Sequence, residues 1–76
     1  MSYHTHDLPL AATLLHKNCQ LIDLERRSSA SEFVFEDSVE LRGIVDQYWR
    51  DELLCPAQSL LAALKRAKHI LYDFKK

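Results

Sequence analysis

The spacing of hydrophobic residues predicts a short strand over residues 2–6, followed by a strongly apolar helix. Asp7 is a suitable N-cap, and Pro9 falls in the first helical turn, where its missing N–H costs nothing. Apolar side chains from Leu8 onward cover about 200° of the helical wheel, so we expect this helix to be buried on most sides. Asn18 is expected to end it in the left-handed conformation.

Two strands joined by a polar turn are predicted next. The first carries Ile22 and Leu24 in alternation, and the second, residues 32–36, places Phe33 and Phe35 on one face. We expect both phenylalanines in the core, covered by the helices. The hairpin is antiparallel, and the N-terminal strand is expected to pair with the phenylalanine strand after a right-handed crossover through the first helix.

Two further helices complete the pattern. Asp37 and Glu40, three residues apart, resemble a capping box for the second helix, and Pro56 suits the start of the third. The stripe that we expect to face the sheet from the second helix comprises Leu41, Ile44, Val45, Tyr48 and Trp49. These segments predict a single α+β domain over residues 1–76, with the order β-α-β-β-α-α and a small, three-stranded, mostly antiparallel sheet packed by three helices.

Charge is distributed unevenly along a chain whose net charge is only −1. Residues 1–37 carry three bases against six acids, whereas residues 57–76 carry five bases against one acid. This asymmetry favours an anionic partner or head-to-tail association. The two cysteines, together with the lack of a leader-like start or a long apolar run, lead us to expect a cytoplasmic protein with reduced thiols.

The pair His4 and His6 is a candidate for metal chemistry, because residues two apart on a strand point to the same face. A structural zinc site uses four ligands, and His16, Cys19 and Cys55 stand at no known spacing from the pair. The alternative is an exposed, solvated terminus. We favour that alternative and predict no metal or other cofactor.

Catalytic motifs are missing from the sequence, which has no Gly-rich phosphate loop, no G-x-S-x-G and no H-E-x-x-H. Cys55 precedes Pro56 at a helix start, where the helix dipole favours a thiolate, but free cysteines are usually small packing residues. Asp37 and Glu40 are accounted for as helix caps. We therefore predict that the protein is not an enzyme.

The third helix is expected to carry a basic face with one aromatic side chain. This face comprises Lys65, Lys68, His69, Tyr72 and Lys76. Such a face can contact phosphates, with the tyrosine as a stacking platform. Exposed charged faces are more often only solvated, and the acidic remainder of the chain argues against a nucleic-acid partner. Nucleic-acid binding is therefore the alternative function.

An apolar seam on the same helix suggests self-association. The seam comprises Leu60, Leu64, Leu71 and Phe74. Surplus apolar surface on a small domain is commonly buried in a symmetric dimer, although the three apolar stripes can also meet in one monomer core. The leading hypothesis is a non-enzymatic interaction module that binds a protein partner and forms a homodimer.

Three stretches carry a family resemblance. Residues 3–15 contain an aromatic-x-Thr-x-Asp-Leu-x-Leu-Ala-Ala start, residues 33–37 an F-x-F-E-D strand end, and residues 64–72 a Leu- and Lys-rich helix. In these stretches the chain resembles a family of small prokaryotic and viral proteins labelled only as a domain of unknown function. Asn18 stands where that family usually has glycine, and the loop 51–55 departs from a glycine-containing version. The resemblance implies no activity, cofactor or catalytic residue.

Overall fold

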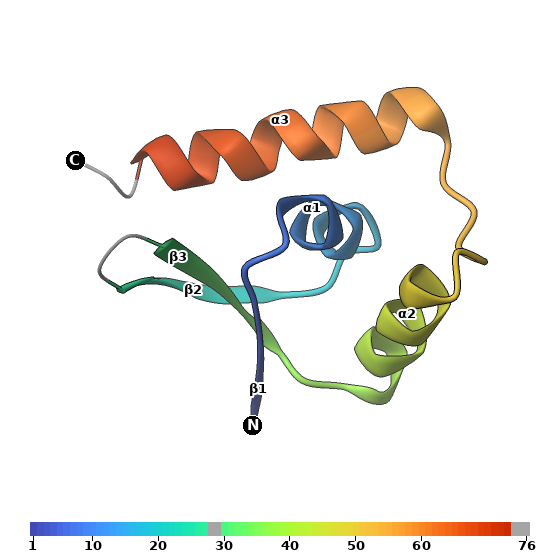
Figure 1. Cartoon of the computed structure of the whole chain (residues 1–76), viewed down its shortest axis with the longest axis horizontal. Helices are drawn as coiled ribbons and strands as arrows, with labels where there is room; N and C mark the ends of the chain where they lie inside the picture. Colours follow the sequence, from blue (N-terminus) through green and yellow to red (C-terminus); the bar gives the residue numbers. More distant parts are fainter. Residues whose placement is uncertain (28–29, 74–76) are drawn as a thin grey trace.

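The computed structural model describes residues 1–27 and 30–73, which form three strands and three helices in the predicted order (Figure 1). The elements are β1 (Ser2–Thr5), α1 (Leu8–His16), β2 (Leu21–Arg27), β3 (Ala30–Glu36), α2 (Val39–Trp49) and α3 (Ala57–Asp73). The α+β class and the β-α-β-β-α-α order are confirmed. Within the described part of the chain, no helix has the length and apolar character needed to cross a membrane.

The sheet is antiparallel throughout, with the strand order β1-β3-β2. Tyr3 lies opposite Phe35 and Thr5 opposite Phe33, so the predicted pairing of the N-terminal strand is confirmed. The predicted right-handed crossover is wrong. The handedness rule applies to a crossover between two parallel strands, whereas β1 and β3 are antiparallel. After α1 the chain first forms the edge strand β2 and then turns back as β3 into the middle of the sheet, antiparallel to both neighbours.

A bulge in β2 changes which of its side chains reach the core. Leu21 lies opposite Phe35 and Asp23 opposite Val34, which leaves Ile22 as an extra residue between them. As a result Leu24 is 5% exposed but Ile22 is 50% exposed. The simple alternation predicted for this strand is therefore wrong at Ile22, because the inserted residue shifts the pattern by one position.

Both predicted ends of α1 are confirmed. The Asp7 side chain accepts a hydrogen bond from the backbone N–H of Leu10 at 3.0 Å. At the other end Asn18 has a φ of 64°, the left-handed conformation expected of a residue that replaces glycine. Asp51 has a φ of 59°, so the loop after α2 also uses a left-handed residue, again without glycine.

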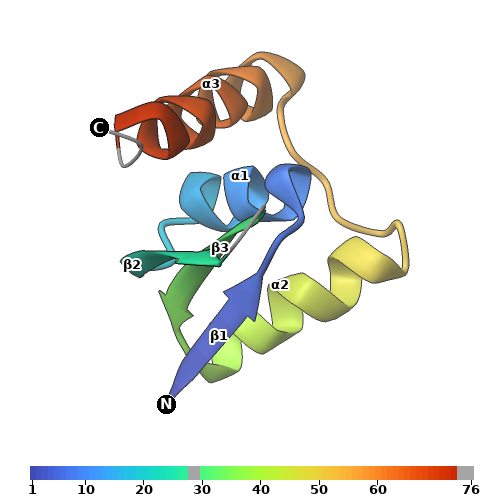
Figure 2. The ribbon, with the colours of Figure 1, turned by 60° about the vertical axis from the view of Figure 1, so that its left-hand side comes forward.

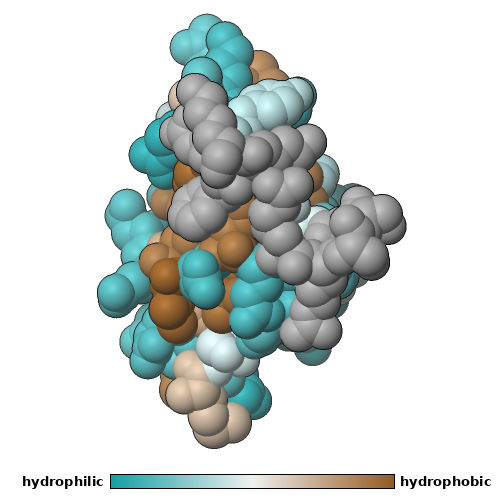
Figure 3. Space-filling model, turned by 90° about the vertical axis from the view of Figure 1, so that its left-hand side faces the viewer, coloured by the Kyte–Doolittle hydropathy of each residue, from teal (hydrophilic) through white to brown (hydrophobic). Residues whose placement is uncertain are grey.

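The five residues 10–14 of α1 are at most 3% exposed, and this confirms that the helix is buried on most sides. One side of α1 packs on the sheet, where Phe33 and Phe35 are almost fully buried, and the other packs on α3 through Ala63 and Ala67 (Figures 1 and 2). Viewed from the hairpin end, hydrophobic side chains show in the middle of the visible surface, with hydrophilic ones to the left of them and at the top (Figure 3).

The helices do not all cover the sheet as expected. Helix α3 packs mainly on α1 rather than on the strands, so the layers are sheet, α1 and α3 (Figure 2). Helix α2 lies beside these layers, and on it Leu41 is buried whereas Trp49 is 63% exposed. The α2 N-cap is Ser38, whose Oγ accepts from the Leu41 N–H at 3.0 Å. The capping role predicted for Asp37 is wrong, because this carboxylate binds Arg42 instead.

The bulge predicts very different costs for two neighbouring aliphatic residues. Leu24→Ala removes a buried side chain and is expected to lower the free energy of unfolding by about 2–5 kcal/mol. Ile22→Ala removes a half-exposed one and is expected to cost less than about 1 kcal/mol. Urea unfolding of the two variants measures both changes in the free energy of unfolding. Equal decreases for the two variants would contradict the bulge at Ile22.

Candidate interaction site

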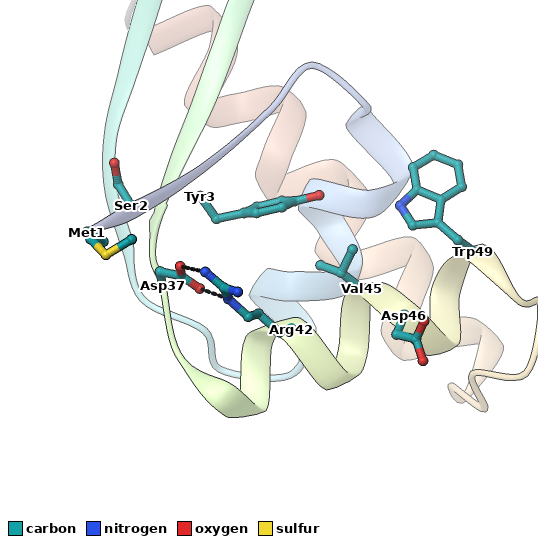
Figure 4. A pocket seen from close by; sticks show the side chains of 8 residues that line it. All are labelled: Met1, Ser2, Tyr3, Asp37, Arg42, Val45, Asp46 and Trp49. Atoms are coloured by element: carbon teal, nitrogen blue, oxygen red, sulfur yellow. Dashed lines mark hydrogen bonds and ion pairs between the residues drawn. The ribbon is translucent and has the colours of Figure 1, made fainter.

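An open apolar hollow of about 520 Å³ lies between the edge strand β1 and helix α2 (Figure 4). We call it the β1–α2 hollow. Its lining residues are Met1, Ser2, Tyr3, Asp37, Arg42, Val45, Asp46 and Trp49. The Tyr3 ring extends from the strand toward Val45 and Trp49 on the helix, so the hollow has aliphatic and aromatic walls (Figure 4).

The aromatic wall is held in place by contacts outside the hollow. Trp49 packs edge-on against Tyr48, with ring centroids 5.0 Å apart and an interplanar angle of 88°. The Tyr48 hydroxyl donates a hydrogen bond to Asp7 Oδ1 at 3.3 Å, which ties α2 to the N-cap of α1. The exposed indole of Trp49 is therefore positioned before any ligand arrives.

Both tyrosines near the hollow are kept protonated. Burial raises the pKa of the Tyr3 hydroxyl, an effect that a side-chain hydrogen bond with Trp49 partly offsets. Burial also raises the pKa of the Tyr48 hydroxyl, and the nearby Asp7 carboxylate raises it further. At neutral pH these side chains act as apolar rings with a polar tip, and neither is prepared to act as a base.

One rim of the hollow is a two-point ion pair. Arg42 donates from Nε to Asp37 Oδ1 at 3.0 Å and from Nη2 to Oδ2 at 2.7 Å (Figure 4). This hydrogen bonding lowers the pKa of the Asp37 carboxyl and raises that of the Arg42 guanidinium. The pair gives the hollow a fixed charged edge beside its apolar floor.

The structure places most of the predicted basic face on one side of α3. Lys65, Lys68 and His69 are exposed, and Tyr72 is 62% exposed, on the side of the helix turned away from the buried alanines. Arg66 points elsewhere, because its Nη2 donates to the carbonyl oxygen of Leu15 at 3.4 Å. Lys76 lies outside the described residues.

The predicted self-association seam turns largely toward α1. Leu64 and Leu71 are partly buried and pack against the core cluster. Leu60 is half-buried near Tyr48, and Phe74 lies outside the described residues. Leu64 and Leu71 thus already have packing partners within the monomer.

The cysteines are free thiols in the structure. Cys19 packs against the core, and burial raises the pKa of its thiol, with a further contribution from the Glu40 carboxylate. A thiol that stays protonated is a weak nucleophile, so the position of Cys19 supports a packing role.

The histidine pair gains partners that the sequence did not suggest. On the outer face of the sheet, His4 Nδ1 lies 2.8 Å from Glu32 Oε1 and 3.7 Å from Glu25 Oε1, and His6 Nε2 lies 3.0 Å from Glu32 Oε2. The group of potential ligands found among the described residues is His4, Glu25 and Glu32, without the cysteines considered from the sequence. The usable signal was the hairpin itself, which pairs Glu25 directly with Glu32.

The family assignment rests on nearly the full length of the chain. Residues 1–73 match the family model described as "Domain of unknown function (DUF5659)". The chain belongs to this family. The family resemblance seen in the sequence is thereby confirmed, and the description of DUF5659 assigns no activity. No curated protein and no solved structure matches the chain.

Proposed function

We propose that this DUF5659 protein is a non-enzymatic interaction module that binds an extended segment of a protein partner in the β1–α2 hollow. The observation that carries the proposal is an exposed tryptophan beside the free edge of a strand. Trp49 is 63% exposed and Met1 is 96% exposed, on either side of the half-buried Tyr3. Positioned aromatic side chains next to apolar hollows are typical anchors of protein interfaces.

The edge of β1 supports an extended ligand. The carbonyl oxygen of Met1 accepts from the Asp37 N–H at 3.3 Å, so the strand bonds to β3 through alternate residues starting at Met1. By this alternation Ser2 and His4 direct their backbone groups away from β3, toward the free edge. A partner strand can add there through main-chain hydrogen bonds, while one of its side chains enters the hollow.

The lining chemistry specifies the partner further. The floor is formed by Tyr3 and Val45, which favours an aromatic or aliphatic side chain from the ligand. The rim carries the Asp37–Arg42 pair, whose charges are already matched, so it favours a polar flank rather than a strongly charged one. We therefore expect an extended segment with one large apolar residue among neutral polar ones.

Localisation in the cytoplasm and self-association belong to the same proposal. The cytoplasmic expectation rests on the cysteine usage of the sequence. For a second copy, the surfaces that support association are the β1 edge and the exposed Leu61, because Leu64 and Leu71 of the seam pack against the core. The molecular mass in solution tests this part.

A displayed library of random peptides, selected on the purified protein, tests the binding site. We expect the selected peptides to share one large apolar residue and to bind Trp49→Ala at least tenfold more weakly than the wild type, the loss typical of an interface anchor. The matched control is Leu54→Ala, which removes an exposed apolar side chain, 87% exposed, from the loop before α3. When a selected peptide is added to the wild-type protein, the NMR shifts of the Ser2 and His4 amides should change.

Two results would contradict the proposed site. One is a set of selected peptides that binds Trp49→Ala as tightly as the wild type. The other is a set of peptides that change the NMR shifts of amides in α3 and leave those of β1 unchanged. Because the second measurement uses the unaltered protein, it does not depend on how a variant folds.

The alternative function, nucleic-acid binding by α3, is favoured by one observation. Lys65, Lys68 and Tyr72 share the outer face of the helix and are exposed. Base stacking on a tyrosine flanked by lysines is a common mode of single-strand binding. The net charge of −1 weighs against it, since nucleic-acid modules are usually basic overall.

Fluorescence anisotropy with a labelled single-stranded oligonucleotide tests this alternative. If the face binds phosphates, a double substitution Lys65→Gln with Lys68→Gln should lower the slope of log affinity against log salt by about 1.4. Lys17→Gln, at the exposed end of α1, should leave the slope unchanged. Lack of binding at low salt would remove the alternative.

A further inference from the structure

Three potential metal ligands, His4, Glu25 and Glu32, meet on the face of the sheet opposite α1, and His6 lies beside them against Glu32. Phe33 and Phe35 point toward α1, so Glu32 points to the outer face by the alternation of the strand. Glu25 is directly opposite Glu32, and His4 is paired with Val34 on the same outer face. We propose that this cluster is a binding site for a divalent transition-metal ion of the Zn²⁺ type. Its ligands are His4, His6, Glu25 and Glu32.

The distances already correspond to ligand spacing. His4 Nδ1 is 2.8 Å from Glu32 Oε1, and the ligand atoms of His4, Glu25 and Glu32 all lie within 4.8 Å of one another. His6 Nε2 is 3.0 Å from the other oxygen of Glu32. Ligand atoms bound to one tetrahedral Zn²⁺ at about 2.0–2.1 Å lie about 3.3 Å apart. His4, Glu25 and Glu32 are therefore close enough to share one ion, and His6 is the proposed fourth ligand.

Two of the proposed ligands are carboxylates on neighbouring strands. Glu25 and Glu32 are direct cross-strand neighbours, and the Glu32 side chain is only 13% exposed. Their oxygens can therefore bind one divalent ion from two strands.

The hydrogen bond of His6 also favours a cation at this position. Its Nδ1 lies 3.1 Å from the carbonyl oxygen of Ser31, which can only accept, so Nδ1 carries the proton. The other ring nitrogen, Nε2, lies 3.0 Å from Glu32 Oε2. A backbone carbonyl on the second ring nitrogen is also the usual support of a metal-binding histidine.

His4 has a comparable support. Its Nε2 lies 3.0 Å from the hydroxyl of Ser2, which leaves Nδ1 directed at the carboxylates. The donor set is thus imidazole and carboxylate without a thiolate. This set suits Zn²⁺ and related divalent ions, whereas Ca²⁺ and Mg²⁺ prefer oxygen ligands alone.

The site would link all three strands. His4 belongs to β1, Glu25 to β2 and Glu32 to β3, so one ion connects both edge strands to the central strand. Metal binding should therefore stabilise the folded state, since these ligands come together only when the sheet forms. None of the four ligand side chains lines the β1–α2 hollow, so metal binding and partner binding can be measured separately.

Calorimetric titration of the tag-free, metal-free protein with ZnCl₂ tests the site. We expect one Zn²⁺ per chain and a thermal midpoint that rises with Zn²⁺. The variants His4→Gln and Glu32→Gln should each lose at least tenfold in Zn²⁺ affinity. Loss of a residue that only supports a metal ligand already costs about 10- to 100-fold, so loss of a ligand should cost no less. The matched controls His69→Gln and Glu40→Gln alter exposed residues elsewhere and should bind as the wild type does.

A measurement on the unaltered protein keeps the test independent of variant folding. In NMR spectra, Zn²⁺ should shift the imidazole resonances of His4 and His6 and leave those of His16 and His69 unchanged. The proposal is overturned if the wild type binds no Zn²⁺ in the calorimetric titration. It is also overturned if Zn²⁺ shifts the other histidines and spares these two.

Discussion

The burial of α1 on two opposite sides is the constraint on which the rest of the structure depends. A nine-residue helix with residues 10–14 at most 3% exposed needs an apolar surface both below and above it. The sheet supplies the first through Phe33 and Phe35, and α3 supplies the second through Ala63 and Ala67. Thr13 fits this interior because its hydroxyl donates to the carbonyl oxygen of Pro9 at 2.9 Å.

This layering leaves function to the outer surfaces. The core is filled by α1 and its two neighbours. The surfaces proposed for binding are therefore the sheet face with His4 and Glu32, the β1–α2 hollow at Trp49, and the outer side of α3 at Lys65. The three surfaces differ in charge and polarity. The ligands proposed for them differ accordingly: a divalent cation, an apolar peptide side chain and an anion, respectively.

The sequence predicted what depends on neighbours along the chain. The Asp7 cap, the left-handed Asn18 and the two buried phenylalanines all follow from local rules, and all are confirmed. What it missed depends on register and on packing between distant elements. The bulge that exposes Ile22 has no marker such as glycine, and Asp37 satisfied the capping pattern while Arg42 offered it a stronger partner. For the candidate metal site, the histidine spacing was visible, but its carboxylates arrive only through strand pairing.

Native-state hydrogen exchange of the backbone amides tests the central claim most directly. If α1 is held between the sheet and α3, its amides at residues 10–14 should exchange only through global unfolding, with an opening free energy equal to that of the whole domain. The amides of α2, where only Leu41 is buried, should open at lower free energy. Exchange in α1 as fast as in α2 would contradict the account.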